Sequence, residues 1–197
     1  MKPHVMLALS MSAALVTGAR AADGDARNPE TPAGGGHVLE TRVISQQPQS
    51  FHGWPTLTKT RDGRLVLVYS GGRRGHVCPF GRVDMMTSHD EGRTWTFPRT
   101  ILDTDLDDRD AGILQTPKGT LLVTTFTSLA YVDQMASLRK AIAKGDLPRE
   151  RLAGWEEVHA RLTDGQRTQM LGEWLVRSTD GGLTWSPPVP AIVSSPH

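Results

Sequence analysis

The chain has 197 residues, in which 22 Lys and Arg balance 21 Asp and Glu, so its formal net charge is +1. A near-neutral chain has no overall electrostatic attraction for nucleic acid or for an anionic membrane. The sequence also lacks an uninterrupted apolar run of about 18 residues that would span a bilayer. Its 38% hydrophobic and 22% charged residues are typical of a globular protein. These properties exclude nucleic-acid binding and membrane spanning from the expected functions.

The first 21 residues have the pattern of a secretory signal peptide. Lys2 gives a basic start, residues 5–18 are mostly apolar, and Ala19-Arg20-Ala21 places small residues at the two positions that signal peptidase reads. An amphipathic first helix is the alternative, but the segment has no polar face. We therefore expect cleavage before Ala22, export to the periplasm or the extracellular space, and no membrane anchor after cleavage.

A unit of four strands is predicted next, after an N-terminal segment over residues 22–49. An Asp-Gly turn at residues 62–63 separates the first two strands, and Ser-His-Asp-Glu-Gly-Arg-Thr-Trp at residues 88–95 forms a second turn before the fourth strand. The four predicted strands cover residues 54–57, 64–69, 82–87 and 96–101.

The same unit recurs further along the chain. Residues 178–185, Ser-Thr-Asp-Gly-Gly-Leu-Thr-Trp, match residues 88–95 at five of eight positions. The glycines of the first turns, Gly63 and Gly119, are 56 residues apart, whereas the two eight-residue boxes are 90 residues apart. An insertion of 34 residues between the second and third strands explains the difference. The strands of the second unit are predicted over residues 111–114, 120–125, 174–177 and 186–193.

The repeated box is expected to be structural. A short Ser or Asp side chain accepts hydrogen bonds from nearby backbone N–H groups, Gly adopts a positive φ without steric cost, and Trp anchors the turn through its apolar area. A catalytic turn would have little reason to recur. The structural residues are Ser88, Asp90, Gly92 and Trp95 in the first box, and Ser178, Asp180, Gly182 and Trp185 in the second.

The insertion, residues 131–170, is predicted to be helical. Residues 131–143 contain no Gly or Pro, and Gly145 and Pro148 mark a break. Leu152, Trp155, Val158 and Leu162 then recur at roughly helical spacing, which favours a second short helix. About 40 residues could hardly bury a core of their own, so a separate helical domain is the weaker alternative.

Two copies of Ser-x-Asp-x-Gly-x-Thr-Trp, each between the third and fourth strands of a unit, resemble the Asp-box repeat of the sialidase (neuraminidase) superfamily. The resemblance covers residues 50–197 and implies an all-β fold, a six-bladed β-propeller of four-stranded antiparallel blades. At about 45 residues per blade, about three blades fit in the chain, with the helical insertion in the second and a third beginning near residues 194–197. The chain is then the N-terminal part of a longer protein.

Strand direction sorts the loops of such a repeat onto two faces. Residues 71–82, 102–110 and the insertion fall on one face, whereas the glycine turns and the boxes fall on the other. We expect the longer loops to form the functional site. Their Arg cluster can bind a sugar carboxylate, and their carboxylates and imidazole can transfer protons at a glycosidic oxygen. A solvated, self-paired surface loop is the alternative. The candidate catalytic residues are His52, His76, Asp108 and Asp110, and the candidate substrate-binding residues are Arg73, Arg74 and Arg109.

The resemblance also shows departures at the site. Sialidases carry a Phe-Arg-Ile-Pro motif whose Arg binds the sialic acid carboxylate, and the similar stretch here, residues 51–55, reads Phe-His-Gly-Trp-Pro without the Arg. In the family a Glu-Gly-Arg stretch precedes the acid/base Asp. The similar stretch here, residues 71–74, is followed by a loop that contains His76 and no Asp before Asp84. A further Asp of the family matches Asp108 or Asp110. These departures favour another acidic sugar over sialic acid.

The sequence therefore predicts a secreted glycan-active enzyme, a sialidase-type exo-glycosidase that acts on a carboxylate-bearing sugar. Its expected partner is a glycan. A polysaccharide lyase on the same scaffold, a sugar-binding propeller without catalysis and a protein-interaction scaffold are the alternatives. The single cysteine, Cys78, excludes an internal disulfide. The sequence has no CxxC, HExxH, Gly-Lys phosphate loop or GxGxxG, so we expect neither a metal nor a cofactor.

Overall fold

The computed structural model describes residues 38, 40–45 and 47–191. The predicted signal peptide and the predicted start of a third unit at residues 194–197 lie outside the described residues. None of the helices in the described part is long and apolar enough to cross a membrane.

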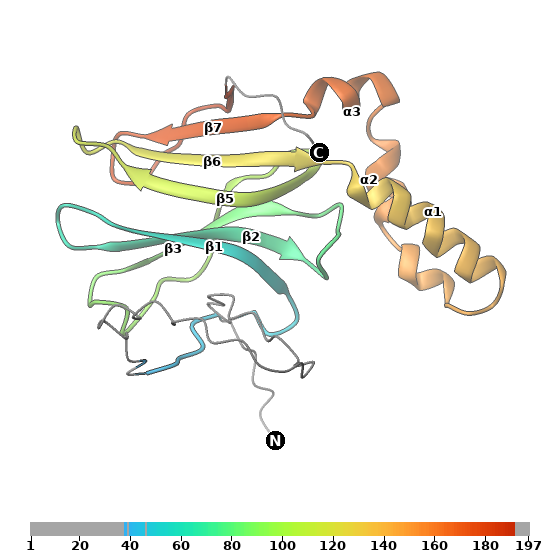
Figure 1. Ribbon diagram of the computed structural model, residues 1–197, viewed down its shortest axis with the longest axis horizontal. Coiled ribbons are helices and arrows are strands. Elements are labelled where there is room, and N and C mark those ends of the chain that lie inside the picture. Colours follow the sequence, from blue (N-terminus) through green and yellow to red (C-terminus); the bar gives the residue numbers. More distant parts are fainter. Residues whose placement is uncertain (1–37, 39, 46, 192–197) are drawn as a thin grey trace, which may run out of the picture.

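The described chain forms two four-stranded antiparallel sheets that lie one on the other (Figure 1). Each sheet holds four strands that are consecutive in sequence and neighbours in space, as the repeat predicted. The first sheet contains β1 (Phe51–Lys59), β2 (Leu65–Arg73), β3 (Arg82–Ser88) and β4 (Arg99–Leu102). The second contains β5 (Asp107–Gln115), β6 (Leu121–Ser128), β7 (Glu173–Ser178) and β8 (Val189–Pro190). The all-β fold with this strand order is confirmed.

The main hydrophobic core lies between the two sheets. Alternation along β2 sends Val66 and Val68 toward the second sheet, where Val123 and Val176 meet them, and all four are at most 1% exposed. Full burial of a side chain of this size stabilises a fold by roughly 1.5–3 kcal/mol. The other face of β2 presents Leu67, which belongs to a smaller cluster that packs against residues outside the sheet.

Both boxes form the same hydrogen-bonded turn. In the first, the Ser88 hydroxyl accepts from the Gly92 N–H at 2.8 Å, and Asp90 accepts from the Thr94 N–H at 2.8 Å and from its hydroxyl at 2.6 Å. In the second, Ser178, Asp180, Gly182 and Thr184 repeat this pattern. Gly92 and Gly182 have φ of 86° and 91°, which explains the glycine at this position. The Ser, Asp and Thr side chains of both boxes are therefore satisfied within the turn, whereas the indole N–H of Trp185 is buried without a hydrogen-bond partner.

The insertion contains more helices than the sequence predicted. The first helix, α1 (Ala130–Ala143), matches the prediction, but a 3-10 turn η1 (Arg149–Leu152), α2 (Trp155–Ala160) and α3 (Asp164–Met170) replace the single second helix. Thr163 caps the start of α3: its hydroxyl accepts from the Gln166 N–H, and the Gln166 side chain bonds back to the Thr163 N–H. This capping box is the local reason for the extra helix.

The two sheets have two different edges. Figure 1 shows the insertion at one end of both sheets and the β1–β2 and β5–β6 hairpin turns at the other. The end of β2, the start of β5 and the insertion form what we call the loop edge, and the boxes lie at the opposite, box edge. The predicted sorting of the loops onto two faces is therefore confirmed.

Candidate active site

A buried ion pair fixes the β2–β3 loop to the start of β5. The guanidinium of Arg73 donates to both carboxylate oxygens of Asp107, and both side chains are 0% exposed. Gly81 lies against this pair, because a Cβ atom there would be 1.9 Å from an Asp107 oxygen. Burial raises the pKa of Asp107 to about 6, and the hydrogen bonds from Arg73 oppose that shift. The loop and the strand are thus held at a fixed distance.

Two unusual backbone conformations occur at equivalent points of the repeat. Trp54 and Asp110, 56 residues apart, have φ of 49° and 50°, and each lies where the register of its strand shifts against its neighbour. The Asp110 N–H is held by the hydroxyl of Ser70 at 2.9 Å. Bulges turn side chains away from the regular alternation, and strained non-glycine residues gather at functional sites. Both side chains line the same pocket.

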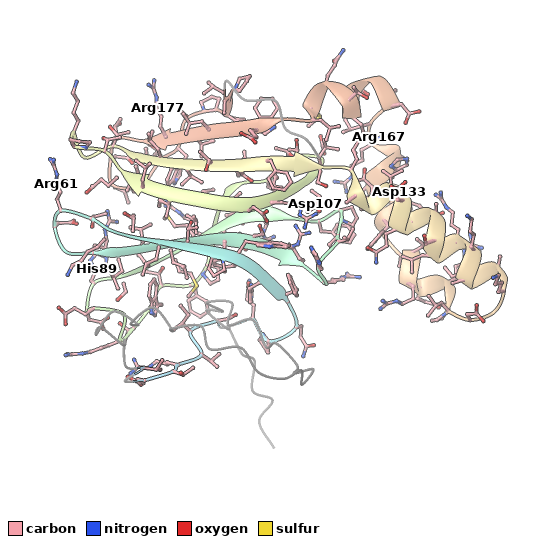
Figure 2. The ribbon with its side chains drawn as sticks, viewed as in Figure 1. Arg61, His89, Asp107, Asp133, Arg167 and Arg177 are labelled. Carbon is pink, nitrogen blue, oxygen red and sulfur yellow. The ribbon has the colours of Figure 1, made fainter. Side chains whose placement is uncertain are left out.

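That pocket has a volume of about 830 Å³, within the range of small-molecule sites. The sheets provide one wall and the insertion the other. Figure 2 shows Asp107 at the loop edge with Asp133 and Arg167 of the insertion on the same side, whereas Arg61 and His89 lie at the far end of the sheets. The lining side chains with polar or aromatic groups include Trp54, His76, Arg109, Asp110, Phe126, Asp133, His159, Asp164 and Arg167.

Two arginines bring positive charge to the pocket from opposite walls. The Arg109 guanidinium lies 4.9 Å from the Trp54 ring centroid and 5.9 Å from that of Phe126, and its Nε is buried without a hydrogen-bond partner. Its Nε is 4.0 Å from an Asp107 oxygen. Arg167, 8% exposed in its side chain, donates to the carboxylate of Asp164 and to the backbone carbonyl of His159. The rings and carbonyls orient both cations.

The groups that can transfer protons are on both walls as well. Asp110 and His76 come from the sheet side, and the His76 ring lies 5.2 Å from the Trp54 ring between centroids. On the insertion, the hydroxyl of Tyr131 is 3.3 Å from Nδ1 of His159. Burial lowers the pKa of His159, and the nearby Arg167 lowers it further. The pocket therefore contains three carboxylates, of Asp110, Asp133 and Asp164, and two imidazoles beside two guanidinium groups.

Three predicted site residues are brought together: His76, Arg109 and Asp110 all line the pocket. Arg74 lies next to it, in a smaller neighbouring pocket. Arg73 is buried, and its guanidinium is occupied by Asp107 and by the carbonyl of His76. This placement makes Arg73 a residue that holds the loop, rather than one that can reach a sugar in this conformation.

His52 and Asp108 do not line the pocket. Nε2 of His52 is 2.6 Å from the Ser45 hydroxyl, and its ring contacts Tyr69 on the far side of β2. Asp108 is 0% exposed and accepts from the N–H and hydroxyl of Thr104 at 2.7 and 3.1 Å. Burial raises its pKa to about 7. Their common place in the repeat thus puts both outside the pocket, His52 half-buried and Asp108 fully buried.

Several pocket residues were missed by the sequence reasoning. Trp54 could have been found, since it stands beside Pro55 at the place of the motif that departs from the family. Phe126 directly follows the strand predicted over residues 120–125 and lies in β6, where a period-2 position does not distinguish a pocket from a core. His159 and Arg167 belong to the insertion, and no pattern in the sequence indicates which of its polar side chains face the sheets. Among the described residues no three His, Cys, Asp or Glu side chains are arranged to hold a metal ion.

Comparison with known proteins gives a distant relationship to a sialidase. No protein-family model matches the chain. A sialidase from Micromonospora viridifaciens is 30% identical over 189 residues, which take in 92% of this chain and 26% of that enzyme. The chain thus spans about a quarter of the length of this relative. The similarity supports a sialidase-like relationship and suggests a glycan-active protein.

Two solved structures resemble the chain. A Dyadobacter fermentans protein of unknown function superposes with a TM-score of 0.50 and 23% identity, over 75% of this chain and 38% of that one. The Hadza microbial sialidase Hz136 gives a TM-score of 0.48 and 18% identity, over 71% of this chain and 25% of that one. At this level of identity the first match shows the fold alone.

Proposed function

We propose that the chain belongs to an exported glycoside hydrolase that removes a terminal, carboxylate-bearing sugar from a glycan. The observation that carries this proposal is the pocket at the loop edge, where Arg109 and Arg167 lie with Asp110 and His76. The sequence similarity to a sialidase supports the same class of reaction. We further infer that the two sheets are blades of a propeller, because they repeat one unit and lie face to face.

Arg109 is the expected binding residue for the sugar carboxylate, because the guanidinium of Arg167 already donates to Asp164 and to the backbone carbonyl of His159. A guanidinium presents paired N–H donors that match the two oxygens of a carboxylate, and partial burial makes such a bond stronger than in water. Arg109 suits this role best, because it lines the pocket and its Nε has no hydrogen-bond partner. Trp54 adds an aromatic surface against which the apolar face of a sugar ring can pack.

Asp110 and His76 are the expected acid and base. Hydrolysis of a glycosidic bond needs one group that protonates the leaving oxygen and one that activates water or attacks the anomeric carbon. A carboxylate on a strained bulge and an imidazole on the adjoining loop can supply these two functions. His159 on the opposite wall, next to the buried hydroxyl of Tyr131, is a further proton donor or acceptor that a bound sugar would meet.

A sugar-binding protein without catalysis is the second candidate. The observation that favours it is Gly53-Trp54-Pro55, where the related sialidase motif has an Arg before Ile-Pro. Such a protein would still hold an acidic sugar beside Arg109, but it would release the sugar unchanged.

The test uses the full-length protein with 4-methylumbelliferyl glycosides of glucuronic acid and N-acetylneuraminic acid, measured side by side. We expect turnover of the glucuronide to exceed that of the sialoside. Arg109→Lys keeps the charge but loses the two-pronged hydrogen bond, so kcat/KM should fall roughly tenfold or more. Arg61→Lys, at the box edge, is the matched control. If both free sugars bind but no methylumbelliferone is released, the protein is a sugar-binding protein without catalysis.

A further inference from the structure

A second, smaller pocket adjoins the first at the loop edge. Its volume is about 380 Å³, and it lies between the β2–β3 loop and the insertion. His76 lines both pockets, so the two cavities meet at this side chain. The other polar and aromatic side chains that line it are Arg74, Gln134, Glu150, Arg151 and Trp155.

The second pocket carries two cations from different segments. Arg74 stands on the β2–β3 loop, where its guanidinium lies 5.5 Å from the Phe80 ring centroid. Arg151 stands on η1, which belongs to the insertion. Only one acid, Glu150, lines the same pocket, so its formal charge is positive even with His76 neutral. An anionic group is therefore favoured there.

The rest of the lining suits a sugar ring. Trp155 is 8% exposed and is held in the core of the insertion with Tyr131, Met135 and Leu152, so its position is fixed. The small exposed part of this fixed ring offers an apolar contact to the C–H groups of a pyranose. Gln134 and Glu150 are exposed and offer an amide and a carboxylate to sugar hydroxyls.

We propose that this pocket binds the sugar on the other side of the cleaved bond, and that it prefers a second sugar with an anionic substituent, held by Arg74 and Arg151. His76, where the pockets meet, then lies beside the bond between the two sugars. The inference rests on the proposed function, since it takes the first pocket as the site of the terminal sugar. A carboxylate and a sulfate share the chemistry that two guanidinium groups recognise.

The test compares substrates that share a terminal glucuronic acid. The reference is 4-methylumbelliferyl glucuronide, which has no second sugar. The three others are disaccharides whose second sugar is neutral, 6-sulfated or a uronic acid. The quantity compared is kcat/KM for each disaccharide divided by kcat/KM for the aryl glucuronide. In Arg74→Gln and Arg151→Gln we expect this ratio to fall about tenfold for the two anionic disaccharides. The sulfated and uronic acid disaccharides show which anion is preferred.

Arg149→Gln is the matched control, because Arg149 stands on the same 3-10 turn and lines a different cavity. It should leave every ratio unchanged. Arg151→Lys should recover part of the loss, and thermal unfolding checks that each variant is folded. If the wild-type protein hydrolyses the aryl glucuronide but the two Gln variants leave the ratio unchanged, the second pocket is not this subsite and the proposed function stands. If no substrate is hydrolysed, both proposals are wrong.

Discussion

At the box edge the two sheets carry the same turn with the same Ser, Asp, Gly and Thr hydrogen bonds. At the loop edge they share the bulges at Trp54 and Asp110 but differ in the connection between their second and third strands. The first sheet joins its second and third strands by a short loop held by Arg73 and Asp107, and the second sheet joins them by three helices and a 3-10 turn. At the repeated edge the Ser, Asp and Thr side chains of the boxes satisfy one another and the turn backbone. The unrepeated edge has cations and proton-transfer groups around an open cavity. The repeated turns therefore belong to the scaffold, whereas the candidate site combines a repeated bulge with the connections that differ between the two units.

The carboxylates of the two edges also differ in their pKa values. In the first box, hydrogen bonds from Thr94 lower the pKa of Asp90 to about 2, so this group stays ionised as part of the turn. At the start of β5, burial raises the pKa of Asp108 to about 7. The same residue type thus titrates in the acid range at the box edge and near neutrality at the loop edge.

The largest expected effect is on turnover at the loop edge. If Asp110 and His76 transfer protons, Asp110→Asn and His76→Ala should each lower turnover of the aryl glucuronide about 10²–10⁴-fold while thermal unfolding stays nearly unchanged. His89→Ala, an exposed histidine in the first box, is the matched control and should leave turnover unchanged. A near-normal rate in both loop-edge variants would exclude them as acid and base, and would direct attention to His159.

The repeat made most of the scaffold predictable from the sequence. Strand order, the place of the insertion and the sorting of loops follow from Gly63, Gly119 and the two boxes, because these turns need particular residue types. The pocket was only partly predictable. His76, Arg109 and Asp110 were found from charge in a loop, but Arg73 has the same charge and is buried against Asp107. Which of several cations is buried depends on tertiary contacts that a linear pattern does not contain.

The next effect is on the pH dependence of stability. An Asp with a folded pKa of about 7 and an unfolded value near 3.9 binds its proton more tightly in the folded state, so it destabilises the fold as pH rises from about 4 to 7. Asp108→Asn should remove this loss, on the order of 4 kcal/mol at pH 8, and should change little at pH 4. Urea unfolding at both pH values measures it. An equal change at the two pH values would contradict the buried, protonated state of Asp108.

A smaller effect is expected from the tryptophan of the first box. Trp95 is half-buried against the cluster of Leu67, Tyr69 and Met86, and its indole N–H donates to the Gly92 carbonyl at 3.0 Å. Trp95→Ala should lower the free energy of unfolding by about 2–3 kcal/mol, less than a fully buried tryptophan would cost. The folded fraction should keep its kcat. Loss of turnover at an unchanged melting temperature would reverse the assignment of the box as structural.

The smallest effects compare the two copies of the box with each other. The hydroxyls of Ser88 and Ser178 accept from the glycine N–H of their boxes at 2.8 and 2.7 Å and donate to the box aspartates at 2.8 and 2.7 Å. Because the geometry is the same, Ser88→Ala and Ser178→Ala should each cost about 1 kcal/mol of unfolding free energy. The double variant should cost the sum, since the two boxes share none of these bonds. Urea unfolding of the two single variants and the double variant measures this. A large cost for one copy and none for the other would show that the boxes are alike in sequence but not in energetic role.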